Sequence, residues 1–214
     1  MATLSEEKED DTKLWHMRLG HMSVKGLLEL HKRKLLIGIK TCSLDFCKFC
    51  VFGKQHKLSL KQVEHTTKGI LDYVHTFFWG PTLFWSKGGA EYFLTFIDDY
   101  SRKVWVYFMK HNSEVFEQFK LWKVQVEKAT GRKVKYLRSD NGGEYKSREF
   151  QIFYVEEGIR RHYTMPYGPE QNGVAERMNR TLTERAKSMR LNSGLPEEFW
   201  AKAVNMACYL VNKA

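Results

Sequence analysis

Residues 92–109 read YFLTFIDDYSRKVWVYFM, two runs rich in β-branched and aromatic residues that enclose the polar stretch from Asp98 to Arg102. Such runs are typical of β-strands, and a polar connection this short favours an antiparallel hairpin. Three similar runs lie elsewhere in the chain. The sequence therefore predicts five strands, at residues 70–79, 92–97, 103–109, 134–139 and 159–163.

Helical patterns alternate with these strands. Apolar residues recur at helical spacing from Val115 to Val126, with Ser113 placed as the N-cap and Gly131 placed to end the helix. The order of elements predicts an α/β fold, in which helices cover both faces of a mixed sheet. Further helices are expected at 148–157 between Ser147 and Gly158, at about 171–191, and from near Pro196 onward.

The composition favours a folded, basic protein. The 214 residues include 43% hydrophobic and 14% aromatic residues, enough for a core, and the formal charge is +10. A positive excess favours a polyanionic partner, because each neutralised phosphate releases a counterion. On charge alone, a basic protein without such a partner is equally compatible.

The chain lacks the marks of membrane insertion or secretion. It contains no run of 18 apolar residues, and the acidic residues 1–11 include no apolar core of a signal peptide. We therefore expect an intracellular protein, nuclear or cytoplasmic and without a membrane partner. In such a reducing compartment the four cysteines favour metal ligation or free thiols over disulfides.

A histidine pair and a cysteine pair predict a zinc site. Four residues separate His16 from His21, and two separate Cys47 from Cys50. Zinc takes four tetrahedral nitrogen or sulfur ligands, and paired ligands allow two short elements to hold one ion. A segment of ~45 residues can hardly stabilise itself without metal. We interpret the site as structural; the alternative is two surface histidines and two buried cysteines.

Several motifs together resemble the integrase of copia-type LTR retrotransposons, of plant type. Trp15-His16 with Gly20-His21 and the cysteine pair resemble its pre-integrase zinc module. From about residue 70 onward the chain resembles the RNase H-like catalytic core, as in FIDDYSR at 96–102 and Gly-Leu-Pro at 194–196. The resemblance covers nearly everything after residue 12. It implies a fragment of a Pol polyprotein, truncated within the core at its C-terminus.

The resemblance also implies a chemistry. In this family two aspartates and one glutamate hold two Mg²⁺ or Mn²⁺ ions, which flank the scissile phosphate. Attack by water gives DNA 3′-end processing, and attack by the new 3′-hydroxyl on target DNA gives strand transfer. Asp140 and Glu176, with 35 residues between them, match the second and third carboxylates. The implied partners are element ends, target DNA and further integrase copies.

The first carboxylate position is occupied by Phe77, in the stretch VHTFFWGP at 74–81. A phenyl ring cannot ligate Mg²⁺, which takes oxygen ligands. Asp72 lies five residues back on the opposite face of the strand, about 16 Å away, and cannot substitute. Asp98 and Asp99 stay open as substitutes, although the family uses neither, and Glu144 is interpreted as a loop-ordering acid. The sequence predicts severe loss of integrase chemistry, leaving two hypotheses: an integrase enzyme, or an inactive remnant that binds nucleic acid or an integrase partner.

The long helix supplies candidate DNA contacts. Arg180 lies one helical turn from Glu176 and shares its face, where a cation can reach a phosphate. Arg177 and Lys187 add charge, and Asn141 resembles a loop position that closes over DNA. The expected organisation is a disordered leader at 1–12, the zinc module at 13–58, a linker at 59–69 and the catalytic core at 70–214.

Overall fold

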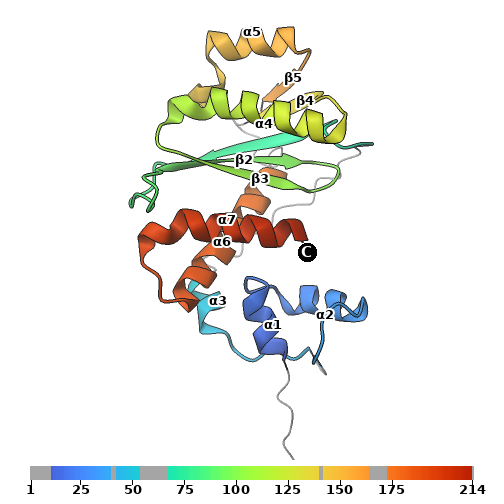
Figure 1. The fold of residues 1–214 in the computed structure, drawn as a ribbon, viewed down its shortest axis with the longest axis vertical. Helices are drawn as coiled ribbons and strands as arrows, with labels where there is room; N and C mark the ends of the chain where they lie inside the picture. The colour runs from blue at the N-terminus through green and yellow to red at the C-terminus, as the bar shows by residue number, and fades with distance from the viewer. Residues whose placement is uncertain (1–10, 40–41, 54–66, 140–141, 164–172, 214) are drawn as a thin grey trace, which may run out of the picture.

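The computed structural model describes residues 11–39, 42–53, 67–139, 142–163 and 173–213. Its centre is a five-stranded sheet in the order β3-β2-β1-β4-β5 (Figure 1). The predicted RNase H-like α/β class, with a mixed sheet flanked by helices, is confirmed. The strands are β1 Val74–Trp79, β2 Tyr92–Asp98, β3 Val104–Met109, β4 Tyr136–Ser139 and β5 Arg160–Tyr163.

The strand pairing fixes which residues lie side by side. β1, β2 and β3 are antiparallel neighbours, whereas β4 and β5 run parallel to β1. In this register Phe77 lies opposite Thr95, and Val74 lies opposite Asp98. The first strand begins at Val74 rather than at the predicted residue 70. Leu71 has a positive φ of 64° and donates its backbone N–H to Asp98 Oδ1 at 2.8 Å, so the segment before Val74 is a turn.

Two helices cover one face of the sheet, α4 Val115–Thr130 and α5 Arg148–Glu156. Gly131 ends α4 in the left-handed conformation, and the Ser147 hydroxyl accepts the Phe150 N–H at the start of α5, both as predicted. The predicted cap at Ser113 is wrong. Ser113 lies inside a 3₁₀ turn, η1 Asn112–Glu114, whose Glu114 side chain accepts the backbone N–H groups of residues 110 and 111.

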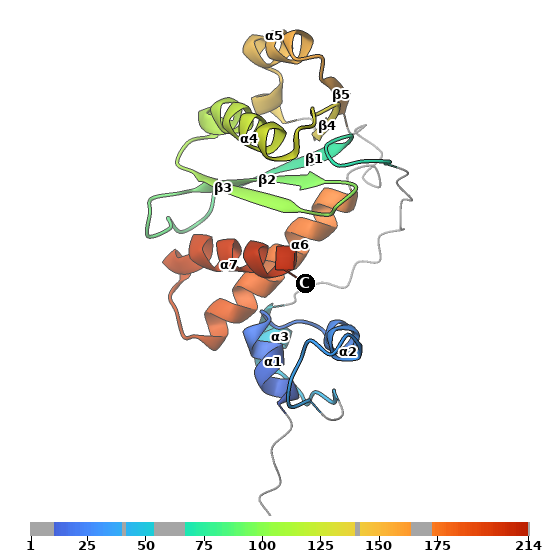
Figure 2. The same cartoon turned by 45° about the vertical axis from the view of Figure 1, so that its right-hand side comes forward.

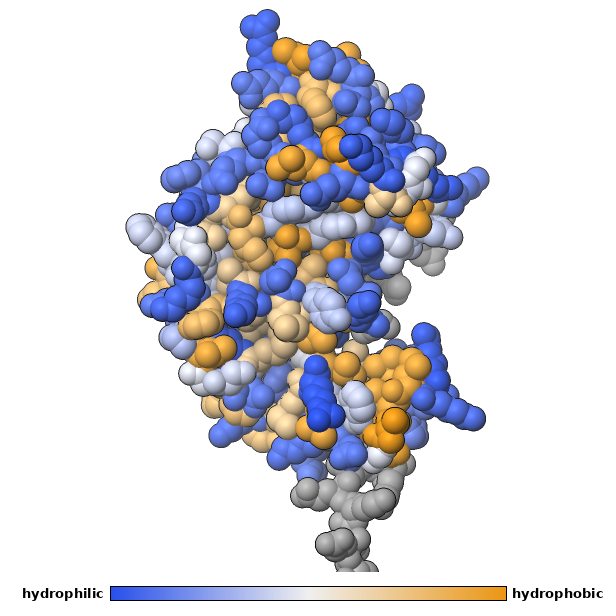
Figure 3. Space-filling model, viewed as in Figure 1, coloured by the Kyte–Doolittle hydropathy of each residue, from blue (hydrophilic) through white to orange (hydrophobic). Residues whose placement is uncertain are grey.

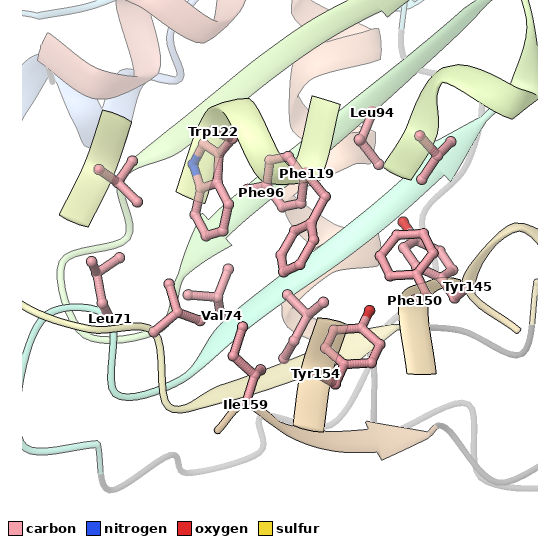
Figure 4. Packing of buried hydrophobic residues seen from close by; sticks show 14 of the residues in the cluster. Leu71, Val74, Leu94, Phe96, Phe119, Trp122, Tyr145, Phe150, Tyr154 and Ile159 are labelled. Carbon is pink, nitrogen blue, oxygen red and sulfur yellow. The ribbon is translucent and has the colours of Figure 1, made fainter. Parts of the chain in front are cut away.

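The larger hydrophobic core lies between this helix pair and the sheet (Figure 4). Trp122 of α4 is fully buried and stacks on Phe96 of β2, with ring centroids 4.1 Å apart. Phe119 and Phe150 are also fully buried. These aromatic residues therefore belong to the packed core.

The opposite face carries α6 Gly173–Asn192 and α7 Trp200–Lys213, with the short 3₁₀ turn η4 Glu197–Phe199 before α7 (Figures 1 and 2). A second cluster of buried residues fills the space between these helices and the sheet, and includes Ala175, Leu182 and Ala207. Phe77 of β1 packs against it. No helix within the described ranges is long and apolar enough to cross a membrane.

The N-terminal part folds as three short helices, α1 Thr12–Arg18, α2 Val24–Lys32 and α3 Lys48–Gly53. Its own core is a small cluster around Met22 and Leu27. Figure 3 shows apolar side chains gathered on the surface of this part, consistent with exposed fractions of 60% for Leu35 and 83% for Ile37. A core this small gives little stability without a further tie.

The N-terminal part packs on the larger domain through α3, which lies against α6 (Figure 2). A Cβ at Gly53 would collide with the Ser188 side chain of α6. A Cβ at Gly20 would meet Leu210 of α7 at 2.7 Å. Glycine therefore permits close approach at both points of contact.

Candidate functional site

The structure brings the four predicted zinc ligands into one cluster. One ligand atom from each of His16, His21, Cys47 and Cys50 lies within 4.8 Å of all the others. Both histidines are buried, and both cysteines are half-buried. Cys47 lies just before α3 and Cys50 within it, so that the cluster joins α1 to α3.

Local structure orients the two histidines. His16 lies on α1, and its Nδ1 is 2.7 Å from the carbonyl oxygen of Met22. A proton on Nδ1 makes this hydrogen bond and leaves Nε2 as a lone-pair donor, the arrangement typical of metal-binding histidines. His21 follows the helix in the left-handed conformation, with a φ of 56°, which turns its ring back toward His16. Their ring centroids are 4.9 Å apart.

The distances within the cluster fit a tetrahedral ion. With bonds of about 2.0 Å to nitrogen and 2.3 Å to sulfur, tetrahedral zinc places two nitrogens about 3.3 Å apart and nitrogen and sulfur about 3.5 Å apart. His16 Nε2 lies 3.1 Å from His21 Nδ1 and 3.3 Å from Cys50 Sγ. Cys47 Sγ lies 3.5 Å from His21 Nδ1. The donor set and its spacing fit zinc, with every coordination position filled by protein.

The predicted carboxylate site is described only in part. β4 ends at Ser139, and Asp140 and Asn141 lie outside the described residues. Glu176 is half-buried in the first turn of α6, next to the fully buried Ala175. α6 packs along β1, so Glu176 belongs to the helix that covers the strand holding Phe77.

Phe77 lies near the middle of β1 with an apolar environment. Its ring packs against the cluster under α6 and α7. A hydrogen bond between the Thr95 hydroxyl and Asn179 Oδ1, 3.0 Å long, connects the neighbouring strand to α6. Asn179 donates in turn to the Ala175 carbonyl at 2.8 Å. Phe77 is half-buried, and the described residues around it form an apolar cluster whose polar neighbours, Thr95 and Asn179, are hydrogen-bonded.

Two acids that could replace the missing carboxylate at position 77 form other contacts. Asp72 pairs with Lys135 at 2.6 Å. Asp98 lies three residues from Thr95 along β2, about 10 Å from the level of Phe77. Both of its oxygens accept local hydrogen bonds, from the backbone N–H groups of residues 71 and 101 and from the Ser101 hydroxyl. The possibility that Asp98 substitutes for the missing ligand is therefore removed by geometry.

Asp99 forms a buried network at the same end of β1. Its carboxylate accepts a hydrogen bond from the Thr67 hydroxyl at 2.6 Å, lies 3.1 Å from His75 Nε2 and pairs with Arg102 at 3.3 Å. These contacts fix the hairpin between β2 and β3 against the start of β1. Sequence reasoning did not identify this network or the Thr95–Asn179 bond, because each joins residues that are far apart in the chain.

Glu144 lies in a 3₁₀ turn, η2 Gly143–Tyr145. Its carboxylate folds back so closely that a Cβ at Gly142 would collide with it. This position suits the loop-ordering role predicted for Glu144.

The basic residues of α6 face different surroundings. Lys187 borders a cavity of about 460 Å³ that is also lined by Trp79 and Trp200. Arg177 borders a different cavity of about 260 Å³, together with Arg102 and Arg185. Arg180 and Lys187 are seven residues apart, so they lie nearly on one stripe of the helix. The three predicted DNA contacts on α6 therefore form two surfaces, and Asn141 lies outside the described residues.

Two further arginines of α6 are placed by the fold. Arg190 donates to the Leu195 carbonyl at 2.8 Å and pairs with Glu197 at 2.6 Å, so it ties α6 to the turn before α7. Burial lowers the pKa of Arg185. Arg190 is thus a structural residue rather than part of a solvated helix face.

Comparison with known proteins identifies two domains. The GAG-pre-integrase domain matches residues 1–55, and the integrase core domain matches residues 79–169. The fold agrees with this class. The chain superposes with a TM-score of 0.51 and 21% identity on a chain of the cryo-EM structure of simian T-cell lymphotropic virus intasome in complex with PP2A regulatory subunit B56 gamma. The superposition covers 94% of this chain and 67% of that one.

The chain is similar to Pol polyproteins of plant transposons. The chain is 48% identical over 208 residues to the retrovirus-related Pol polyprotein from transposon TNT 1-94 of Nicotiana tabacum, covering 97% of this chain and 16% of that protein. It is 29% identical over 200 residues to the corresponding polyprotein from transposon RE2 of Arabidopsis thaliana, covering 93% of this chain and 14% of that protein. The chain thus spans less than a fifth of either relative. It belongs to the integrase region of retrotransposon Pol polyproteins, which confirms the resemblance predicted from its motifs.

Proposed function

We propose that this chain is a zinc-stabilised integrase scaffold that binds DNA and no longer cuts or joins phosphodiester bonds. The observation that carries the proposal is Phe77, an apolar side chain at the first carboxylate position of the family. The ring packs into a hydrophobic cluster, and Asp72 and Asp98 are engaged elsewhere. With Phe77 at the first carboxylate position, the residues present do not fit the family's catalytic metal pair.

The binding function is supported by charge and by the family. The formal charge of +10 favours a polyanion, and Arg180 and Lys187 form a basic stripe on the helix that carries Glu176. We propose element ends and target DNA as ligands, further copies of the chain as partners, and an intracellular location. Zinc, when bound, supplies a rigid tie between α1 and α3. His16, His21, Cys47 and Cys50 are the residues that would hold it.

The competing function is an active integrase, which the family, Asp140 and Glu176 favour. A strand-transfer assay in Mg²⁺ or Mn²⁺ separates the two. We expect no joined product from the unmodified chain and measurable product from Phe77→Asp, which restores a negatively charged carboxylate ligand. Phe77→Asn is the matched control, because the asparagine side chain has the size of aspartate but carries no charge. We expect this variant to be inactive.

The outcome against this proposal is joined product from the unmodified chain at the level given by Phe77→Asp. A second check uses Glu176→Gln in the Phe77→Asp background, which we expect to abolish the restored activity. Thermal unfolding of each variant shows whether a loss of product reflects a loss of fold.

A further inference from the structure

A group of aromatic and basic side chains lies on the outer part of the sheet, over β4 and β5. It consists of Tyr73, just before β1, Tyr136 and Arg138 of β4, and Arg160 and His162 of β5. We call these five residues the aromatic–arginine platform. Arg160 and His162 are exposed, and the other three are half-buried. None belongs to the zinc cluster or to the carboxylate positions.

The strand register places the platform on the same face of the sheet as Phe77. Val74 and Leu137 are register partners that point into the core under α4 and α5. Side chains alternate along a strand, so His75 and its partner Arg138 point to the opposite face, where Phe77 also lies. α6 and α7 contact β1 and β3 on that face. The platform continues the same face beyond β1.

The platform residues contact one another in rows across the strands. Tyr73 and Tyr136 stack with ring centroids 5.9 Å apart and an interplanar angle of 16°. Arg160, the register partner of Tyr136, donates to the Tyr136 hydroxyl at 3.2 Å. In the next row Arg138 pairs in register with His162 and lies over the Tyr73 ring, 5.5 Å from its centroid. The result is a continuous surface of rings bordered by guanidinium groups.

The distance from this surface to position 77 matches a short piece of nucleic acid. Tyr73 and Phe77 are four residues apart along the chain, about 13 Å at 3.3 Å per residue. A strand of a DNA duplex advances 3.4 Å per nucleotide, so this separation is about four nucleotides or fewer. A strand that reaches the carboxylate positions would therefore pass within reach of the platform.

The charge of the platform is positive. The pKa of His162 is lowered by burial and by the neighbouring Arg138, as expected where cations gather. Burial raises the pKa of Tyr73, although Arg138 acts in the opposite direction. Among the described residues, Asp72 pairs with Lys135, and Asp99 pairs with Arg102 and His75. The five residues of the platform thus comprise two tyrosines, two arginines and a histidine, and none of the five is acidic.

We infer that the aromatic–arginine platform binds an unpaired nucleic-acid strand next to the phosphodiester site, with Arg138 and Arg160 contacting phosphates and the rings stacking on bases. Rings beside a positive groove are the usual means of holding single strands, because every base presents a face for stacking. The inference deepens the proposed function and rests on it. It places a second nucleic-acid-binding surface on the sheet, in addition to the basic residues of α6.

Fluorescence anisotropy of the full chain with a labelled single-stranded oligonucleotide tests the inference, with the matching duplex as a second arm. We expect Arg138→Ala/Arg160→Ala to weaken single-strand binding roughly tenfold or more, because two charged contacts are lost. The slope of the logarithm of the binding constant against the logarithm of the salt concentration should become shallower by about 0.7 for each lost phosphate contact. Tyr136→Leu should weaken binding roughly 5- to 100-fold through lost stacking, whereas Tyr136→Phe keeps the ring and should bind like the unmodified chain.

Lys128→Ala/Arg148→Ala is the matched control. It removes the same charge from exposed positions on α4 and α5, which cover the other face of the sheet. Equal losses in control and platform variants would overturn the inference, as would unchanged single-strand binding or an effect on the duplex alone. An altered oligomeric state with unaltered binding would show instead that this face contacts a second copy.

The experiment also separates this inference from the proposed function. If the unmodified chain binds neither oligonucleotide, the platform inference and the proposed DNA-binding function are both wrong. If it binds and the platform variants bind equally well, only the platform assignment is wrong. The melting temperature of each variant identifies unfolding, and Tyr136→Phe against Tyr136→Leu tests stacking even if the arginine pair fails to fold.

Discussion

The side chain at position 77 is suited to packing. Phe77 contacts an apolar cluster, and a carboxylate placed there without a cation would lose hydration without gaining a partner. We expect Phe77→Asp to lower the free energy of unfolding by about 1–3 kcal/mol in the absence of divalent ions. Phe77→Leu keeps the position apolar and serves as the control. Urea unfolding measures both, and equal stability of the two variants would contradict this account.

Cys208 provides a test of burial at a single thiol. It lies on α7 and is only 5% exposed, and burial raises its pKa from 9.0 to about 11. The folded thiol therefore stays protonated when the unfolded one ionises. Its contribution to stability is present below pH 9 and is lost as the pH rises to about 11. We expect slow alkylation of Cys208 at pH 8, followed by mass spectrometry, and fast alkylation after unfolding. Similar rates in the two states would contradict the assignment.

The individual helices show how far sequence patterns extend. Caps that depend on one residue, such as Ser147 and Gly131, were predictable because the interaction is local. The cap before α4 was not predictable, because Glu114 and the preceding backbone replace the serine that the pattern favoured. Similarly, the turn at Leu71 depends on a hydrogen bond to Asp98, 27 residues away. Local chemistry predicts elements, whereas their exact ends depend on tertiary partners.

One acid connects α4 to the strand that follows it. Glu127 accepts the Val134 N–H at 2.9 Å and pairs with Lys123, which is 3% exposed, and with Lys133. Burial of Glu127 acts to raise its pKa, but these donors outweigh burial, so the pKa lies below the ordinary value of 4.5. A carboxylate with a lowered folded-state pKa stabilises the protein above pH 4.5, and this stabilisation is lost as the pH falls below that value.

We therefore expect Glu127→Gln to destabilise the chain by about 1–3 kcal/mol at pH 7. The difference from the unmodified chain should shrink as the pH falls from 5 to 3. Thermal unfolding across this range measures both effects. Glu149→Gln, in the first turn of α5, is a control with an exposed acid. A difference that is independent of pH would argue against the ionised form as the cause.

For the molecule as a whole, the grouping of two histidines and two cysteines was predictable, and its placement against the larger domain was not. The spacing of His16, His21, Cys47 and Cys50 identified one cluster because the chemistry of zinc restricts ligand types. No pattern indicated that α3 would lie on α6, since that contact depends on Gly53 meeting Ser188. The platform was missed for the same reason, because its residues come together only through strand register.

Removal of the metal should therefore affect helix α6 of the larger domain as well as the N-terminal part. We expect Cys47→Ser to lower the zinc content measured by metal analysis and to increase hydrogen exchange in α6 around residues 184–188. Cys42→Ser, a buried cysteine outside the cluster, is the control and should keep its zinc. Undiminished zinc in Cys47→Ser would mean that the ligands are misassigned.

A substitution at the contact between α3 and α6 separates the packing of the N-terminal part from its metal binding. Gly53→Val should keep the zinc ligands but place a side chain against Ser188. We expect a full complement of zinc together with the same increase in exchange in α6. Unchanged exchange would show that the N-terminal part does not support this helix.

Helix α6 is contacted by α3 at Ser188 and carries Glu176 near its other end. Glu176 and Ser188 are twelve residues apart, which is about 18 Å along the helix at 1.5 Å per residue. A small tilt at one end of a stiff rod becomes a displacement of the other end. We expect zinc in the four-residue cluster to fix α3, and thereby to set the angle at which α6 lies across the sheet. A titration with zinc should then also change the position of Glu176.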